Sequence, residues 1–160
     1  MPFDHHEDED DRQVWICRFA DDERGGWGQH RHHQHQLAWV ARGSATVEVG
    51  DQEWLVPPTQ ALWIPSGAPH DIRVRAGSEL HCLYAWPESC PVDWDEPTVL
   101  AITPLLRELL LCIGEAEVEV EVEAAAQVVL FGLLRPVEAA GLELLPVSYT
   151  HLTLPTNREV

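Results

Sequence analysis

The chain has 160 residues, a length typical of one domain of ordinary size. Apolar residues make up 45% of it, and 27 acidic against 10 basic residues give a formal net charge of −17. Because so acidic a surface repels phosphate backbones, we do not expect this chain to bind nucleic acid through its overall field. No apolar run is long enough to span a membrane, so no membrane partner is expected. The N-terminus lacks a secretory signal and the four cysteines form no CxxC pair, which is typical of a cytoplasmic protein with reduced thiols.

The first twelve residues are acidic and carry almost nothing to bury, which predicts a disordered tail over residues 1–12. Over residues 13–95, short runs rich in Val, Ile, Trp and Leu end at Gly, Pro, Asp or Ser, a pattern typical of β-strands. Seven strands at this spacing indicate a sandwich or a barrel. We expect these strands at residues 14–19, 36–41, 45–50, 53–56, 61–65, 70–75 and 79–86.

A change of period after the predicted strands indicates a helical segment over residues 96–136, reached through a linker rich in Pro, Asp and Glu at residues 87–97. Thr103 is a candidate N-cap, Pro104 suits the first helical position, and Gly114 is a stop signal.

A second helix is expected at residues 117–135. The alternation of Glu and Val at its start, taken alone, is typical of a strand, but the apolar continuation favours a helix. Its first half is expected to be weak, because Glu115, Glu119 and Glu123 repel one another at a spacing of four residues. Joined by a short turn, the two helices predict an antiparallel pair.

The densest run of one potential ligand type is HRHHQHQL at residues 30–37, with histidines at positions 30, 32, 33 and 35. It can be a metal site, a solvated loop or the remains of a metal site put to another use. If this run is a strand, His30 and His32 converge on one face while His33 points away. His70, which follows a turn at residues 65–67, offers a third metal ligand.

The spacing from His30 and His32 to Gln36 and Gly43 resembles the first cupin motif, HxHx3Ex6G, and residues 65–70 resemble the second. This resemblance implies a metal site formed by His30, His32, position 36 and His70. Position 36 is Gln, and a neutral amide lacks the negative charge of the carboxylate on which catalytic cupins rely. The resemblance therefore favours a sensor over an enzyme.

A longer pattern is similar to the N-terminal effector domain of AraC-type transcription regulators: HxHxxHQL at residues 30–37, a Trp-x-apolar-Pro-Pro segment at 54–58, WIPxGxPH at 63–70 and a helical segment at 99–111. The resemblance implies a mainly β fold, a cupin (double-stranded β-helix, jelly-roll) barrel followed by the helix pair. It also implies a small-molecule effector and a homodimer. The effector pocket would be formed by His30, His32, His35, Gln36, Trp39, Trp63, His70 and Tyr84, and the dimer by Leu105, Leu106, Leu109 and Leu110.

We therefore expect the ligand-sensing and dimerisation part of an AraC-type regulator, truncated before the helix-turn-helix domain through which the family reads DNA. Residues 137–147 would begin the linker, and residues 148–160 resemble a translated sequencing adapter rather than native sequence. No catalytic residue and no resident cofactor is expected. The alternatives are a small metal-binding cupin enzyme, a dioxygenase or isomerase with Zn, Ni, Fe or Mn on His30, His32 and His70, and a stand-alone interaction protein.

Overall fold

The computed structural model describes residues 12–20, 27–115 and 117–137, and these form eight strands and two helices. The predicted tail at 1–12, apart from its last residue, and nearly all of residues 137–160 lie outside this part of the chain. Each of the seven predicted strands is present within about a residue or two of its expected bounds. The strands are β1 (Val14–Ala20), β2 (His35–Arg42), β3 (Ala45–Val49), β4 (Gln52–Val56), β5 (Gln60–Ile64), β6 (His70–Val74), β7 (Glu79–Ala85) and β8 (Thr98–Ala101).

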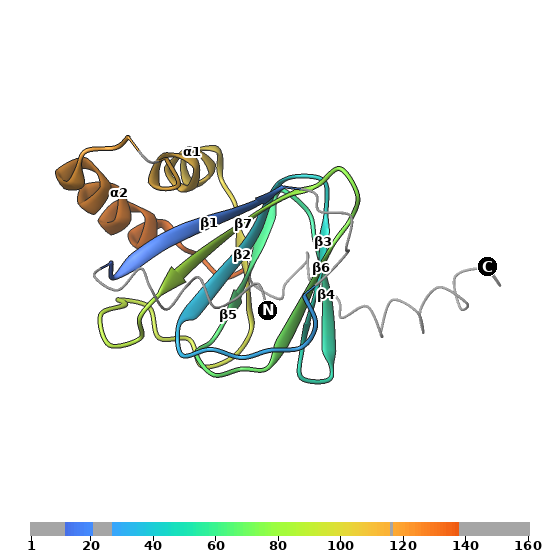
Figure 1. The fold of residues 1–160 in the computed structure, drawn as a ribbon. Coiled ribbons are helices and arrows are strands. Elements are labelled where there is room, and N and C mark those ends of the chain that lie inside the picture. Colours follow the sequence, from blue (N-terminus) through green and yellow to red (C-terminus); the bar gives the residue numbers. More distant parts are fainter. Residues whose placement is uncertain (1–11, 21–26, 116, 138–160) are drawn as a thin grey trace.

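The strands form two antiparallel sheets, one of five strands in the order β1-β7-β2-β5-β8 and one of three in the order β4-β3-β6. The sheets pack face to face, since Val47, Trp54 and Ile72 of the smaller sheet share a buried cluster with Ala38 and Leu80 of the larger one. The helices lie on the opposite side of the five-stranded sheet (Figure 1). The predicted fold class, a mainly β jelly-roll barrel followed by a helix pair, is confirmed.

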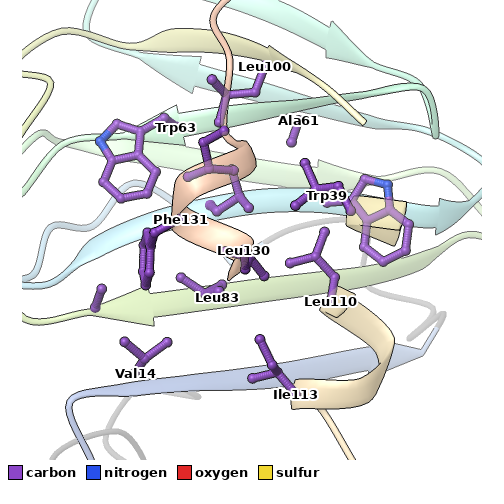
Figure 2. Close-up of a cluster of buried hydrophobic side chains, with 14 of the residues drawn as sticks. Val14, Trp39, Ala61, Trp63, Leu83, Leu100, Leu110, Ile113, Leu130 and Phe131 are labelled. Atoms are coloured by element: carbon purple, nitrogen blue, oxygen red, sulfur yellow. The ribbon is translucent and has the colours of Figure 1, made fainter. Parts of the chain in front are cut away.

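The five-stranded sheet is buried on both faces, and its side chains alternate between them. On β2, Ala38 and Val40 point toward the three-stranded sheet, while Leu37 and Trp39 point toward the helices. We call these two sides the barrel face and the helix face. Figure 2 shows the helix face, where side chains from all five strands of the sheet meet Leu110 and Ile113 of one helix and Leu130 and Phe131 of the other.

Helix α1 (Pro104–Ile113) begins as its sequence predicts, because the Thr103 hydroxyl accepts a hydrogen bond of 3.2 Å from the backbone N–H of Leu106. Helix α2 (Val120–Leu133) begins three residues later than predicted, which agrees with the weakness expected of its Glu-rich start. No helix in the described part of the chain is long and apolar enough to cross a bilayer.

One strand was missed. Residues 98–101, which we placed at the start of the helical segment 96–136, form β8 and pair with β5. The sheet therefore extends past residue 95, where we placed the end of the barrel. The predicted linker before β8 is also packed rather than free, since Cys90, Val92 and Trp94 lie against the helix-face cluster. A run of four residues beside a stronger helical pattern carries too little periodicity to be recognised from sequence.

Candidate functional site

Three histidines meet at the edge of the barrel, where residues 30–34 pass the start of β6. This segment is not a strand, so the reason we gave for the convergence of His30 and His32 was wrong. Instead, His30 and His70 exchange backbone hydrogen bonds of 2.9 and 2.8 Å in an isolated bridge. The ring centroids of His30 and His70 are 4.3 Å apart, and those of His32 and His70 are 5.0 Å apart. One ring nitrogen from each histidine lies within 4.8 Å of the other two.

Backbone carbonyls fix the orientation of all three rings. Nδ1 of His30 lies 2.8 Å from the Gly28 carbonyl oxygen, Nδ1 of His32 lies 3.0 Å from that of Gln34, and Nδ1 of His70 lies 2.8 Å from that of Ala68. Because a carbonyl can only accept, Nδ1 carries the proton in each ring, and in a neutral ring Nε2 is left with its lone pair. The cluster therefore presents Nε2 of His30 and of His70 as hydrogen-bond acceptors or metal ligands, whereas Nε2 of His32 already contacts the Gln36 side chain.

His70 is the most buried of the three, with 1% of its surface exposed. Burial, which disfavours the imidazolium form, lowers its pKa from 6.5 to about 4, and the neighbouring His30 and His32 act in the same direction. The ring is therefore neutral at neutral pH. Its Nε2 atom is buried and has no hydrogen-bond partner among the described residues.

Gln36, at the position of the cupin carboxylate, is buried on the barrel face with its side-chain Oε1 2.9 Å from His32 Nε2. An amide can pair with a ring nitrogen either as donor or as acceptor, whereas a glutamate carboxylate can only accept. A glutamate here would therefore favour a protonated ring or a bound cation.

A small cavity of about 10 Å³ adjoins the histidines between the two sheets, with room for about one water molecule. His32 also contacts this region, because its ring centroid lies 5.5 Å from that of Tyr84. Five of the eight residues predicted to form the pocket are thus brought together: His30, His32, Gln36, His70 and Tyr84. The cavity is lined by Phe19, Trp27, His30, Gln36, Ile72, Leu80, Cys82 and Tyr84.

The other three predicted pocket residues, His35, Trp39 and Trp63, lie on the helix face, so they do not share a pocket with the first five. His35 Nδ1 accepts a 3.0 Å hydrogen bond from the backbone N–H of Ser66, and its ring lies 5.1 Å from that of Trp63. Trp39 donates to the Pro58 carbonyl at 3.0 Å. Side chains alternate along β2, so residues 35 and 39 cannot share a face with Gln36.

The four leucines predicted to form the dimer interface differ in how far the structure buries them. Leu106 and Leu110 are buried in the helix-face core of their own chain, and Leu109 packs against it. In this conformation the first two are not available to a partner, because the hydrophobic face of α1 is used within the chain. Leu105 is 56% exposed.

Five residues lining the cavity were not found from the sequence: Phe19, Trp27, Ile72, Leu80 and Cys82. Two of them had a usable signal, because Leu80 and Cys82 alternate on β7 with Tyr84, which was predicted. The other three come from segments far apart in the chain, and only the strand order brings them together.

The sequence and the geometry together place the chain in a known class. A family model of the AraC-like ligand binding domain matches residues 14–134, and the chain belongs to this family. Its sequence is 35% identical over 113 residues to the HTH-type transcriptional regulator NimR of Escherichia coli (strain K12). That match covers 71% of this chain but only 40% of NimR.

Solved structures with weaker similarity include a conserved protein of unknown function, SPY1581, from Streptococcus pyogenes. It is 20% identical with a TM-score of 0.44, over 49% of this chain and 68% of that one. An RmlC-like cupin from Shewanella frigidimarina is 17% identical with a TM-score of 0.42, over 50% of this chain and 72% of that one.

Proposed function

We propose that this chain is the effector-sensing part of an AraC-type transcription regulator and that the effector binds at the histidine cluster between the two sheets. The observation that carries the proposal is the set of three imidazoles with their Nδ1 atoms fixed on backbone carbonyls. Membership of the AraC-like ligand binding domain family supports it. DNA binding would belong to another part of the full regulator, since NimR is described as an HTH-type regulator and this chain spans 40% of its length.

The size of the cavity implies that binding opens the barrel. Space for about one water molecule cannot hold an organic effector, which needs a few hundred cubic ångströms. Trp27 precedes the histidine segment and lines the cavity, and its ring centroid lies 5.1 Å from that of Phe19. We infer that the effector selects a conformation in which this segment moves outward, and that its affinity is reduced by the cost of opening.

The effector site is tested by thermal-shift screening of neutral sugars and aromatic compounds, followed by calorimetric titration of any compound that binds. His70→Gln should weaken binding tenfold or more, because it removes a fixed acceptor from the floor of the site. His33→Gln is the matched control, since His33 is an exposed histidine of the same segment, paired with the exposed Glu88. Binding that is unchanged in His70→Gln but lost in Trp63→Phe would place the effector on the helix face and contradict the proposal.

We also propose that the chain forms a homodimer, through the outer surface of the helices rather than the buried leucines. Helix α2 has apolar residues on its outer side as well as its buried side: Val120 is 77% exposed and Val128 is 74% exposed. A helix that is apolar all round is usually covered on both sides. Sedimentation should show a dimer that Val128→Glu disrupts. A wild-type chain that stays monomeric at high micromolar concentration would contradict this.

A second candidate function, metal binding, is favoured by the same three imidazoles. A divalent ion such as Zn, Ni, Fe or Mn would be held by His30, His32 and His70, where it would act as a Lewis acid. The three neutral donors fit such an ion, but Gln36 contributes no charge to offset it. We therefore propose sensing rather than catalysis. Elemental analysis of protein purified without a histidine tag measures occupancy, and stoichiometric metal that is lost in His70→Gln would favour the metal-site reading.

A further inference from the structure

Two cysteines face each other across the edge of the five-stranded sheet. Cys17 on the edge strand β1 and Cys82 on β7 are direct register partners. Both side chains lie on the barrel face, where Cys82 belongs to the buried cluster and Cys17 packs against it. Directly opposed residues on one face of an antiparallel pair have Cβ atoms about 4.5–5.5 Å apart. The structure holds all four cysteines as thiols, and no other two are register partners.

The hydrogen bonds between β1 and β7 define the geometry of the Cys17–Cys82 pair more closely. The backbone N–H of Trp86 donates to the Gln13 carbonyl at 3.2 Å, so residues 13 and 86 are a hydrogen-bonded pair. Hydrogen-bonded pairs recur every second residue, which puts Cys17 and Cys82 in the same class, with Cα atoms about 5.5 Å apart. Disulfides occur at Cα separations of about 4.4–6.8 Å. Cβ atoms joined by a disulfide lie about 3.5–4.5 Å apart, so this pair must approach by up to about 1 Å for the bond to form. The disulfide would therefore be strained and easily reduced.

We propose that Cys17 and Cys82 are a reversible redox site, which a hydroperoxide converts into a cross-strand disulfide in the wall of the barrel cavity. Cys17 reacts first, because it is only partly buried and lies on an edge strand. Its sulfur attacks the peroxide oxygen and the O–O bond breaks. Water or an alcohol leaves, and a sulfenic acid remains.

The sulfur of Cys82 then attacks the sulfenic sulfur, so that the S–S bond forms, the S–O bond breaks and water leaves. The two thiols together give up two protons and two electrons to the peroxide. Two molecules of a small thiol, or one dithiol, restore both cysteines by exchange and leave as their own disulfide. Burial raises the pKa of the Cys82 thiol to about 12. This second step should therefore be slow at neutral pH and become faster as the pH rises.

Oxidation would change the site that we assign to the effector, a consequence that rests on the proposed function. Cys82 lines the cavity, and its thiol interacts with the side chains of Gln36 and Tyr84. Drawing its sulfur toward Cys17 removes these contacts. The amide of Gln36, which holds His32, then loses one of its neighbours.

The test is peptide mapping of the full chain after treatment with hydrogen peroxide and alkylation of the remaining thiols. Trypsin places Cys17 in residues 13–18 and Cys82 together with Cys90 in residues 76–107, so Cys90→Ser is the background that removes the ambiguity. We expect these two peptides to be linked, and dithiothreitol to release them. The link should be absent from Cys17→Ser and from Cys82→Ala in the same background, and it should form faster at higher pH.

Three results would overturn the proposal: a link from Cys17 to the peptide that carries Cys112, a link between Cys17 residues of two chains, or alkylation of both Cys17 and Cys82 after the oxidant. The background variant decides the outcome even if Cys82→Ala does not fold. Because the readout is a covalent link, it does not depend on an effector. If the link forms but no compound binds at the histidines, the redox site stands and the proposed function falls.

Discussion

The two faces of the five-stranded sheet are built from the same strands but differ in what they bury. The helix face is covered by α1 and α2 through apolar side chains such as Leu100 and Leu130, both with no exposed surface. The barrel face has its own apolar cluster, but at its edge lie the polar Gln36 and His70, also buried. Under the proposed function, neighbouring residues of one strand would serve stability on one face and recognition on the other. Variants on the two faces should separate these roles.

The largest effect is expected from Leu110→Ala on the helix face. Leu110 is 1% exposed and joins α1 to the sheet, so its truncation leaves a cavity that the surrounding helices can only partly fill. We expect the free energy of unfolding to fall by about 3–5 kcal/mol, measured by urea denaturation. The matched control is Leu105→Ala in the same helix, where exposure should limit the loss to about 0.5 kcal/mol or less. If the two variants lose equal free energy of unfolding, Leu110 is not buried between α1 and the sheet as described.

The second prediction concerns the crossing from β2 in one sheet to β3 in the other. Gly43 has a φ of +87°, and a Cβ atom there would lie 2.8 Å from the Cα atom of Ser78. Ser78 cannot easily withdraw, since its hydroxyl accepts from Ser44 N–H at 2.9 Å and donates to the Ser44 carbonyl at 3.1 Å. Gly43→Ala should therefore cost about 3 kcal/mol in thermal or chemical denaturation.

Gly50→Ala is the control for this substitution. Gly50 also has a positive φ, of +62°, but a Cβ atom there meets nothing within 4 Å. It should cost only the conformational strain, about 1–2 kcal/mol. If both alanine variants lose the same stability, contact with Ser78 adds nothing and the crossing is less tightly packed than the structure indicates.

The two faces also show what the sequence could reveal. Runs of Val, Ile, Trp and Leu between turn residues located seven strands, because such runs are local. Alternation within a strand is local too: applied from Gln36, it places Trp39 on the opposite face. We instead grouped His35 with the site because of the motif and Trp39 as a possible aromatic wall, and neither reason says anything about faces. Phe19 and Trp27 could not be predicted, since their place beside Gln36 depends on the strand order.

The third prediction concerns pH and the barrel face in metal-free protein. The pKa of His70 is lowered from 6.5 to about 4, so between these values the unfolded chain binds the proton more tightly than the folded one. The free energy of unfolding should therefore fall as the pH drops from about 6.5 to 4, by at most about 3 kcal/mol, and this contribution should be constant above that window.

If His70 causes this pH dependence, His70→Gln should flatten the curve of unfolding free energy against pH over the same pH range. His33→Gln, which removes an exposed histidine of the same segment as His30 and His32, is the matched control. The helix-face His81, whose pKa burial also lowers, contributes a slope of the same sign. If the curve flattens only in His81→Gln, the acid sensitivity arises on the helix face and not on the barrel face.

The smallest effect separates two tryptophans of the helix face that differ in one hydrogen bond. Trp39 and Trp63 have no exposed surface, but Trp39 donates to the Pro58 carbonyl at 3.0 Å, whereas the indole N–H of Trp63 has no partner among the described residues. Both Trp→Phe variants lose similar ring volume, and only Trp39→Phe leaves a carbonyl without its donor. We expect Trp39→Phe to be less stable than Trp63→Phe by about 1 kcal/mol in urea denaturation. Both rings face the helices, so neither variant should change effector binding at the histidines. A tenfold loss of binding in either variant would mean that the two faces are not independent.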